Sequence, residues 1–339
     1  MVENNKSRIL LVDDEEDNLA LLYRTLRQDF YILKTTSPLE ALGILQENPV
    51  DLIISDHKMD EMDGVEFLKR SYELQPDCVR LLVTAYSDSS ILIDAINIGK
   101  VYRYVKKPWE PSELLMIVKS AVEYYQLKKE NDRLIQDFKE LFAGTVNAIM
   151  EALDAKDSFT LGRSRRVTFF SLKMVKYFNL PTEQMSKLEL AGLLHDIGMI
   201  GVSEDILNKT ETLSPEEFES IKKHVTHGVK ILEDIKQLKD VVEIIKYHHE
   251  RFDGSGYPYG LKGEDIPLNS RIISIADAYD SMVSKRSYRQ GLSHEDAMKR
   301  IEEQSGRQFD PIVVTAFKAI IDAALEEIEE YELLTVDMA

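Results

Sequence analysis

Short apolar runs alternate with longer amphipathic stretches along the first third of the chain. Five of these runs are rich in β-branched and aliphatic residues and are predicted to be strands. Amphipathic segments of helical length lie between them, and this alternation predicts a doubly wound, five-stranded parallel α/β sheet. The expected strands are Arg8–Val12, Phe30–Thr35, Leu52–Ser55, Arg80–Val83 and Tyr102–Val105.

The pattern becomes helical at Ser112 and stays helical for about 40 residues, with neither proline nor glycine before Gly144. Positions in this stretch alternate steps of three and four, the a/d seam of a coiled coil, and Asn131 falls at an a position that typically fixes register. We expect this helix to pair two chains in a homodimer. A solvent-exposed connecting helix is the alternative, because the last two positions make a weak seam. The seam positions are Tyr124, Leu127, Asn131, Leu134, Phe138, Leu141, Thr145 and Ala148.

Residues 146–339 are predicted to be almost entirely helical. The segment Ser214-Pro215-Glu216-Glu217 is typical of a helix start, since serine caps, proline suits the first turn and the acids complement the helix dipole. A glycine- and proline-rich loop from Gly254 to Pro267 follows a pair of histidines, which favours a pocket-shaping loop over a structural Ω-loop. The chain therefore divides into a 1–125 α/β domain, a 126–145 linker helix and a 146–339 all-α domain.

Composition adds limits on location and partners. A chain of 339 residues with 44% apolar and 30% charged residues is long enough for two or three globular domains. Cys78 is the single cysteine, so no internal disulfide can form, and no apolar stretch approaches the ~20 residues that span a membrane. Residues 1–8 lack the pattern of a signal peptide. We therefore predict a cytoplasmic protein, and its formal charge of -18 argues against DNA or RNA as a partner.

Chemically useful side chains follow four of the predicted strands, namely Asp13-Asp14, Asp56, Thr84 and Lys107. The site of an open α/β sheet lies at the carboxyl ends of its strands, so these side chains should converge. The acids would hold Mg²⁺, Asp56 would be the nucleophile toward a phosphoryl group, Lys107 would be a fixed cation and the Thr84 hydroxyl would bind the phosphate. A surface acidic cluster is the alternative, but the threonine and the lysine at matching strand ends favour a phosphoacceptor.

On these residues the segment resembles a two-component receiver domain. The matching motifs are Val50-Asp51-Leu52-Ile53-Ile54-Ser55-Asp56, Met62-Asp63-Gly64, Leu82-Val83-Thr84-Ala85 and Tyr104-Val105-Lys106-Lys107-Pro108-Trp109. The resemblance implies phosphorylation of Asp56 by a cognate sensor histidine kinase. It also matches Tyr104 to the aromatic residue whose rotation reports phosphorylation, with plain core packing as the alternative. One departure is Asp60, where the family has proline, and this should affect loop rigidity more than chemistry.

A second set of residues indicates metal chemistry. Five of the seven histidines lie between residues 195 and 249, two of them adjacent. Imidazole and carboxylate together suit borderline transition ions, and a carboxylate beside a histidine can bridge two of them. Scattered hydrogen-bonding histidines are the alternative, which such clustering disfavours. The set is His195-Asp196, His224, His248-His249-Glu250 and Asp277 with Asp280, whereas His57, His227 and His294 are predicted to be surface residues.

These residues resemble the motifs of the HD-GYP family, metal-dependent phosphodiesterases for the bacterial second messenger cyclic di-GMP. The resemblance covers most of residues 146–339 and implies a helical HD-type domain. The matching motifs are His195-Asp196-Ile197-Gly198, His224, His248-His249-Glu250-Arg251-Phe252-Asp253-Gly254-Ser255-Gly256-Tyr257-Pro258, Ala276-Asp277-Ala278-Tyr279-Asp280 and Arg286-Ser287-Tyr288-Arg289.

The resemblance implies a centre of two divalent transition ions, iron or manganese, bridged by Asp196. It further implies that Arg286 and Arg289 grip the phosphates of cyclic di-GMP, with solvated surface arginines as the alternative. The loop Gly256-Tyr257-Pro258 would line the guanine side. The implied metal ligands are His195, Asp196, His224, His248, His249 and Asp277.

Three positions depart from the family pattern. Met199 stands where active members carry a lysine, and a thioether cannot supply charge or donate a hydrogen bond. Arg163 stands where the family has a histidine ligand, but arginine is permanently cationic and cannot bind a metal. Phe159 stands where trinuclear members have a glutamate, so a third ion is not expected. These departures predict a slow or inactive enzyme, unless Arg163 reaches into the site and replaces the missing charge.

Three functions therefore compete. A phosphorylation-gated phosphodiesterase for cyclic di-GMP is the preferred one. A cyclic di-GMP sensor or protein-docking regulator that binds without turnover is favoured by Met199 and Arg163 and opposed by the six intact ligands. A receiver-controlled nucleotide phosphohydrolase of the wider His-Asp superfamily is disfavoured by the Gly-Tyr-Pro loop.

Overall fold

The computed structural model describes residues 6–85, 100–156, 162–207, 209, 211–284 and 290–336, with side chains described up to residue 328 in the last of these ranges. The chain divides into two compact units, Met1–Lys139 and Glu140–Ala339. The division falls inside the segment that the sequence predicts to be a linker helix. Among the described residues, no helix is both long and apolar enough to cross a membrane.

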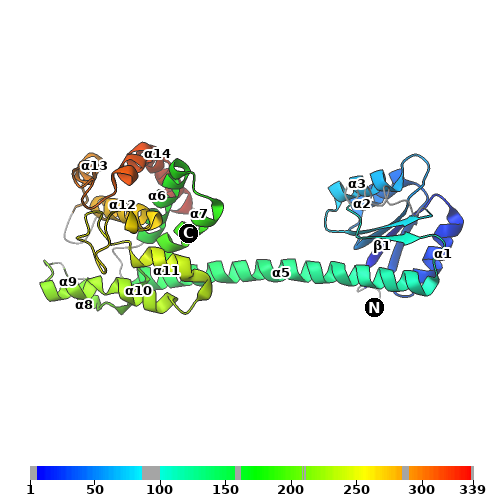
Figure 1. Ribbon diagram of the computed structural model, residues 1–339, viewed down its shortest axis with the longest axis horizontal. Helices are drawn as coiled ribbons and strands as arrows, with labels where there is room; N and C mark the ends of the chain where they lie inside the picture. The colour runs from blue at the N-terminus through cyan, green and yellow to red at the C-terminus, as the bar shows by residue number, and fades with distance from the viewer. Residues whose placement is uncertain are drawn as a thin grey trace. The chain divides into compact units, whose positions relative to one another are not determined.

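The N-terminal unit contains a five-stranded sheet in the order β2-β1-β3-β4-β5 (Figure 1). All four pairs of neighbouring strands are parallel, which confirms the predicted doubly wound sheet. The order reverses between β1 and β3, and ligands of such sheets bind at the carboxyl ends of the strands near this point. The strands are β1 (Arg8–Val12), β2 (Tyr31–Thr35), β3 (Leu52–Asp56), β4 (Val79–Thr84) and β5 (Arg103–Lys106).

Both faces of the sheet are covered, so β3 and β4 are buried along their whole length and β1 is buried from Ile9 to Val12. In β1, Ile9 and Leu11 pack against α1 and the start of α5, whereas Leu10 and Val12 pack against α2 and α3. Successive side chains of a strand point to opposite faces, and helices on both faces require apolar residues at every position. The helices are α1 (Glu16–Leu26), α2 (Pro38–Glu47), α3 (Gly64–Leu74) and α5 (Pro111–Lys156).

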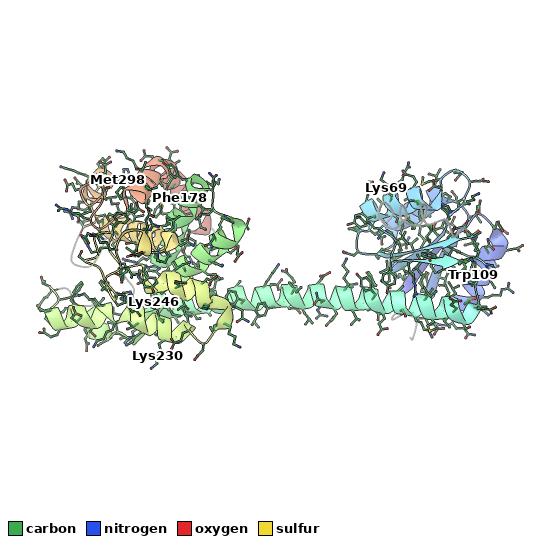
Figure 2. All side chains as sticks on the ribbon, viewed as in Figure 1. Lys69, Trp109, Phe178, Lys230, Lys246 and Met298 are labelled. Atoms are coloured by element: carbon green, nitrogen blue, oxygen red, sulfur yellow. The ribbon has the colours of Figure 1, made fainter. Side chains whose placement is uncertain are left out.

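Helix α5 is a single helix of 46 residues that belongs to both units. Its first turns contribute Leu114 and Val118 to the core of the N-terminal unit, and its last turns contribute Val146 and Met150 to the core of the C-terminal unit. Between them, every side chain from residue 126 to 141 is exposed. Figure 2 shows these side chains projecting away from the helix. All eight positions of the predicted seam are exposed as well.

The C-terminal unit is helical, as predicted, and its core is built on α6, which packs against α7, α12 and α14. Phe170, Tyr279 and Phe317 form an edge-to-face aromatic cluster there, with ring centroids 5.2 to 6.4 Å apart. The elements are α6 (Arg163–Phe178), α7 (Thr182–Leu194), η2 (Ile197–Gly201), α8 (Glu204–Leu207), α9 (Pro215–Lys222), α10 (His224–Leu232), η3 (Lys236–Leu238), α11 (Lys239–Lys246), η4 (Gly263–Asp265), α12 (Leu268–Val283), α13 (His294–Glu303) and α14 (Pro311–Val336).

The predicted helix start at Ser214 is confirmed as the N-cap of α9. The Ser214 hydroxyl accepts the Glu217 backbone N–H at 3.2 Å, and the Glu217 carboxylate accepts the Ser214 backbone N–H at 2.7 Å. This reciprocal pair satisfies two of the N–H groups that a helix N-terminus leaves without intrahelical partners. It fixes the start of α9, whose last turn leads into His224.

Candidate functional site

The carboxyl edge of the sheet brings the predicted phosphoacceptor residues together. Asp13 follows β1, Asp56 ends β3, Thr84 ends β4 and Lys107 follows β5. The Lys107 ammonium group donates to Asp13 at 3.0 Å and also pairs with Asp56. Carboxylate oxygens of Asp13, Asp14 and Asp56 lie within 4.8 Å of one another, an all-oxygen arrangement suited to a hard cation such as Mg²⁺.

Charge and burial act in opposite directions on this pocket. Burial raises the pKa of Asp56, and the hydrogen bond and positive charge of Lys107 oppose that shift. At Lys107 burial lowers the pKa, but the hydrogen bonds and charges of Asp56 and Asp13 outweigh it, so the net shift is upward. Lys107 therefore stays a cation at neutral pH. The Lys58 backbone N–H, 3.0 Å from Asp56 Oδ2, donates a further hydrogen bond to the carboxylate.

Two sequence expectations about this site can be compared with its geometry. Tyr104 is 44% exposed, so the alternative of plain core packing does not apply to it. The Asp60 backbone N–H donates to Asp14 Oδ2 at 3.2 Å. A proline at this position would lack that donor. The departure at Asp60 therefore adds a hydrogen bond to the acidic pocket, beyond any effect on loop rigidity.

The six predicted metal ligands lie together in the C-terminal unit. Their donor atoms form two groups, each within 4.8 Å, and Asp196 belongs to both. Its Oδ1 lies 3.4 Å from His224 Nε2, and its Oδ2 lies 3.0 Å from His195 Nε2. The histidine-rich group consists of Asp196, His224, His248 and His249, and the aspartate-rich group consists of His195, Asp196 and Asp277.

Helix ends aim the imidazole rings into this cluster. His195 Nδ1 lies 2.7 Å from the Gly192 carbonyl oxygen, and His224 and His248 make the same contact with the carbonyl three residues earlier, at 2.7 and 2.6 Å. A ring whose Nδ1–H donates to a carbonyl presents Nε2 as a lone pair. The Nε2 atoms of His224 and His248 are buried and lack a hydrogen-bond partner, whereas His195 Nε2 faces the Asp196 carboxylate at 3.0 Å. Buried acceptors of this kind fit metal ligation.

The pKa values of the clustered histidines are shifted in different directions. Burial lowers the pKa of His249 to about 4 and holds that of His248 well below its usual range, so neither ring is protonated at neutral pH. At His195 burial acts in the same direction, but the carboxylates of Asp196 and Asp277 outweigh it and raise its pKa to about 10. The two groups therefore differ: His248 and His249 of the histidine-rich group are neutral donors, and the carboxylates around His195 in the aspartate-rich group attract positive charge.

Arg163 reaches into the cluster. Its guanidinium donates to Asp277 Oδ1 from Nε at 3.1 Å and from a terminal nitrogen at 2.6 Å, and its Nε lies 3.6 Å from Asp196 Oδ2. Burial acts to lower the pKa of Arg163, yet the charges of Asp277 and Asp196 more than reverse this effect. One turn along α6, Arg166 donates to Asp280 at 2.6 Å, one turn along α12. The two pairs form a ladder between these helices.

The glycine-rich loop is held by Glu250, which lies outside both metal-ligand groups. The buried Glu250 carboxylate accepts the backbone N–H groups of Tyr259, Gly260 and Leu261 at 2.7 to 3.1 Å. The sequence grouped Glu250 and Asp280 with the metal set, but the structure assigns the first to this loop and the second to Arg166.

Close packing places Tyr257 over the cluster. A Cβ at Gly256 would lie 2.2 Å from the Arg251 backbone nitrogen, so a glycine is required for the loop to turn here. The Tyr257 ring stacks on His249 with centroids 4.9 Å apart, whereas Pro258 is exposed. Similarly, a Cβ at Gly198 would meet the His224 carbonyl oxygen at 1.8 Å, so this glycine allows η2 to pack on α10.

A cavity of about 800 Å³ opens beside the cluster, within the range typical of small-ligand sites. Met199, which stands where active members of the HD-GYP family carry a lysine, lines this cavity. Three cationic side chains line it as well, namely Lys156, Arg163 and Lys209. Three of the predicted metal ligands, Asp196, His224 and His249, line it together with Tyr257.

Two family descriptions match this chain: a response regulator receiver domain over residues 9–119 and an HD domain over residues 147–313. A protein of Thermotoga maritima named cyclic di-GMP phosphodiesterase is 31% identical over 95% of this chain and 94% of its own length. The chain belongs to the response regulators that join a receiver domain to an HD domain. A probable cyclic di-GMP phosphodiesterase of Vibrio cholerae is 31% identical over 94% of this chain and 78% of that protein. The cyclic di-GMP phosphodiesterase response regulator RpfG of Xanthomonas campestris is 29% identical over 91% of this chain and 86% of its own length.

Some predictions for this receiver–HD response regulator lie outside the described residues, namely those on Arg286, Arg289 and Phe159. The three histidines predicted to lie on the surface are partly buried. His57 contacts Thr84, and a hydrogen bond of 2.8 Å joins the His294 ring to the Tyr279 hydroxyl. Sequence reasoning missed the cavity-lining lysines Lys156 and Lys209. No motif of the sequence marks them.

We predict that Glu250→Gln destabilises the HD domain. A neutral amide offers one oxygen where the carboxylate accepts three N–H groups, and a buried donor left without a partner costs about 1–3 kcal/mol. Equilibrium denaturation monitored in the C-terminal unit would measure the change. Glu243→Gln is the matched control, since Glu243 is exposed on α11. Equal stability of the Glu250 variant and wild type would contradict the role assigned to this carboxylate.

Proposed function

We propose that this response regulator is a metal-dependent phosphodiesterase for cyclic di-GMP whose activity is controlled by phosphorylation of Asp56. The observation that carries the proposal is the cluster of buried imidazole and carboxylate donors on the wall of a cavity of about 800 Å³. The names of the relatives that align along most of the chain support this substrate. Phosphodiester hydrolysis is a reaction that metal ions in such a site promote.

The donor set supports a divalent transition ion, iron or manganese, because imidazole and carboxylate together suit these ions. The proposed ligands are the six residues of the histidine-rich and aspartate-rich groups. When bound, such an ion supplies Lewis-acid chemistry toward a phosphoryl oxygen. The chain's own contribution is to hold the Nε2 lone pairs in place through the Nδ1 contacts and to keep His248 and His249 unprotonated.

The cavity supplies the remaining recognition of an anionic substrate. The chain has a formal charge of -18, so a phosphodiester needs local positive charge to bind. Lys156, Arg163 and Lys209 line the cavity, but so do the acids Asp154, Asp196 and Glu211. We therefore propose that the bound metal supplies the excess positive charge and that these cations add contacts to the phosphate. We propose that Tyr257 contacts a guanine face, with Gly256 and Pro258 shaping its loop, and that Arg286 and Arg289 add phosphate contacts.

A regulator that binds cyclic di-GMP without hydrolysing it is the second candidate. The observation that favours it is Met199 on the cavity wall, where a thioether leaves phosphate charge unbalanced. Both candidates require metal and ligand binding, so turnover separates them.

We expect the purified, metal-loaded protein to hydrolyse cyclic di-GMP and His248→Ala to lose both activity and metal. Turnover should fall by more than about 100-fold, because even outer-shell partners of metal ligands are worth about 10- to 100-fold. Product chromatography and metal analysis would measure the two effects. His227→Ala, outside the cluster, should retain both. Tight binding of cyclic di-GMP with no product in the wild type would establish the second candidate instead.

We further propose that Asp56 accepts the phosphoryl group from a sensor histidine kinase, with Mg²⁺ held by Asp13, Asp14 and Asp56. Incubation with a small phosphodonor and Mg²⁺ should add one phosphoryl group to wild type and none to Asp56→Asn, as measured by intact mass. Asp60→Asn is the control, because its backbone N–H to Asp14 is unchanged. Labelling that persists in Asp56→Asn would refute the assignment.

The exposed seam of α5 supports pairing with a second copy of this chain. Leu127, Leu134 and Leu141 are 58 to 70% exposed, and Tyr124 and Phe138 are 48 and 62% exposed. These positions follow the a/d spacing of a coiled coil, in which each apolar side chain inserts between residues of the facing helix. We propose a homodimer joined along this seam.

The double variant Leu134→Lys with Leu141→Lys should be monomeric in light scattering, because two buried charges per helix would oppose pairing. Gln136→Lys with Ala143→Lys is the matched control. It adds the same charges at the same spacing, but on the opposite side of the helix from the seam. A monomeric wild type would exclude the proposed dimer. A double variant that stays dimeric would place the interface elsewhere.

A further inference from the structure

Two groups of potential ligands share Asp196, but they differ in what else they contact. The histidine-rich group uses Asp196 Oδ1 and the rings of His224, His248 and His249. The aspartate-rich group uses Asp196 Oδ2, His195 and Asp277 Oδ1, which lies 3.4 Å from His195 Nε2. The Arg163 guanidinium contacts both oxygens of this second group and is largely buried, with its side chain 13% exposed.

Arg163 is fixed in this position by the packing of two helices. It pairs with Asp277, and Arg166, three residues later, pairs with Asp280, three residues after Asp277. Residues three apart lie on the same face of a helix, so the two ion pairs form together when α6 packs against α12. Moving the guanidinium away from Asp277 would leave a buried carboxylate without its partner, which is strongly unfavourable.

A cation in the aspartate-rich group would have to share Asp277 Oδ1 with a permanently charged guanidinium. The two positive charges would lie within a few ångströms in a largely buried site, where repulsion is strong. The histidine-rich group carries no such contact on Asp196 Oδ1 or on the Nε2 atoms of His224 and His248. An ion bound there keeps three imidazole donors and one carboxylate oxygen, a complete set for a transition ion.

We propose that this protein binds one divalent transition ion, in the histidine-rich group, and that the Arg163 guanidinium occupies the place of a second ion in the aspartate-rich group. This inference rests on the metal centre proposed above, and it replaces the two-ion centre that the family resemblance implied with one ion and one fixed organic cation. Arg163 also lines the cavity, so a substrate phosphate bound beside the ion would lie near its guanidinium. In this way it would supply part of the positive charge that a lysine at position 199 supplies in active members of the family.

The test is the metal content of the full-length chain, stripped with a chelator, reloaded with Mn²⁺ and desalted. Every protein compared, including the one with the wild-type HD domain, also carries Asp13→Asn and Asp14→Asn, so that the acidic pocket of the receiver does not contribute to the count. Wild type should retain about one equivalent per chain, and Arg163→His should retain about two, because a neutral imidazole both removes the competing charge and adds a donor. Electron paramagnetic resonance should then show isolated Mn²⁺ in wild type and an exchange-coupled pair in the variant. Arg163→Lys keeps the charge and should stay at about one.

Arg166→His is the matched control, because it makes the same change in the next rung of the ladder, away from the ligand groups. It should leave the metal content at the wild-type value. Two ions in wild type, or one ion in a folded Arg163→His, would overturn this inference and leave the proposed phosphodiesterase standing. No bound ion in wild type would overturn the metal centre itself, and the inference with it.

Discussion

Three imidazole rings of the cluster each bond to a carbonyl group in the last turn of the helix that precedes them. Gly192, Ile221 and Ile245 supply these carbonyls at the ends of α7, α9 and α11. Helix ends leave such groups without intrahelical partners, so one contact satisfies a backbone acceptor and fixes a ring tautomer. The direction of these three Nε2 atoms therefore follows from where the helices end.

The negative charge that this arrangement concentrates is balanced within the protein. Asp277 and Asp280 are buried, and each has an arginine from α6 as its partner. Buried carboxylates without partners would oppose folding, because removing a charge from water is costly. The HD domain can therefore fold with its aspartates neutralised before any ion arrives. The same helix pairing that stabilises the domain also determines which of its ligands remain available.

Much of this organisation could be predicted from the sequence, because it depends on local pattern. The strands of the receiver lie within a residue or two of their predicted bounds, since apolar runs bounded by turn residues have few other solutions. The six proposed ligands of the metal cluster were implied by the resemblance of their motifs to the HD-GYP family, and the structure brings them together. Asp60 shows where local pattern fails: its value to the site is a backbone N–H, and that donor is present in every residue except proline.

Contacts between distant segments were harder to predict. The partner of Arg163 lies 114 residues away, and its position depends on the register between α6 and α12, which no single segment encodes. Arginine was expected not to bind a metal, but only the helix packing shows which carboxylate Arg163 reaches. Glu250 is a similar case. It adjoins two ligands in sequence, yet its carboxylate turns to three backbone groups of the following loop.

The continuity of α5 has a thermodynamic consequence. The side chains of residues 126–141 are exposed, so this stretch gains little from tertiary packing. An isolated helix of that length is marginal in water because its first turn is costly to nucleate. Here both flanking segments are already helical, with their apolar residues in two separate cores. The middle of α5 therefore forms by propagation of helix from its two ends, without a new nucleation step. Loss of packing in either core would favour the coil state of this stretch, starting at the end next to that core.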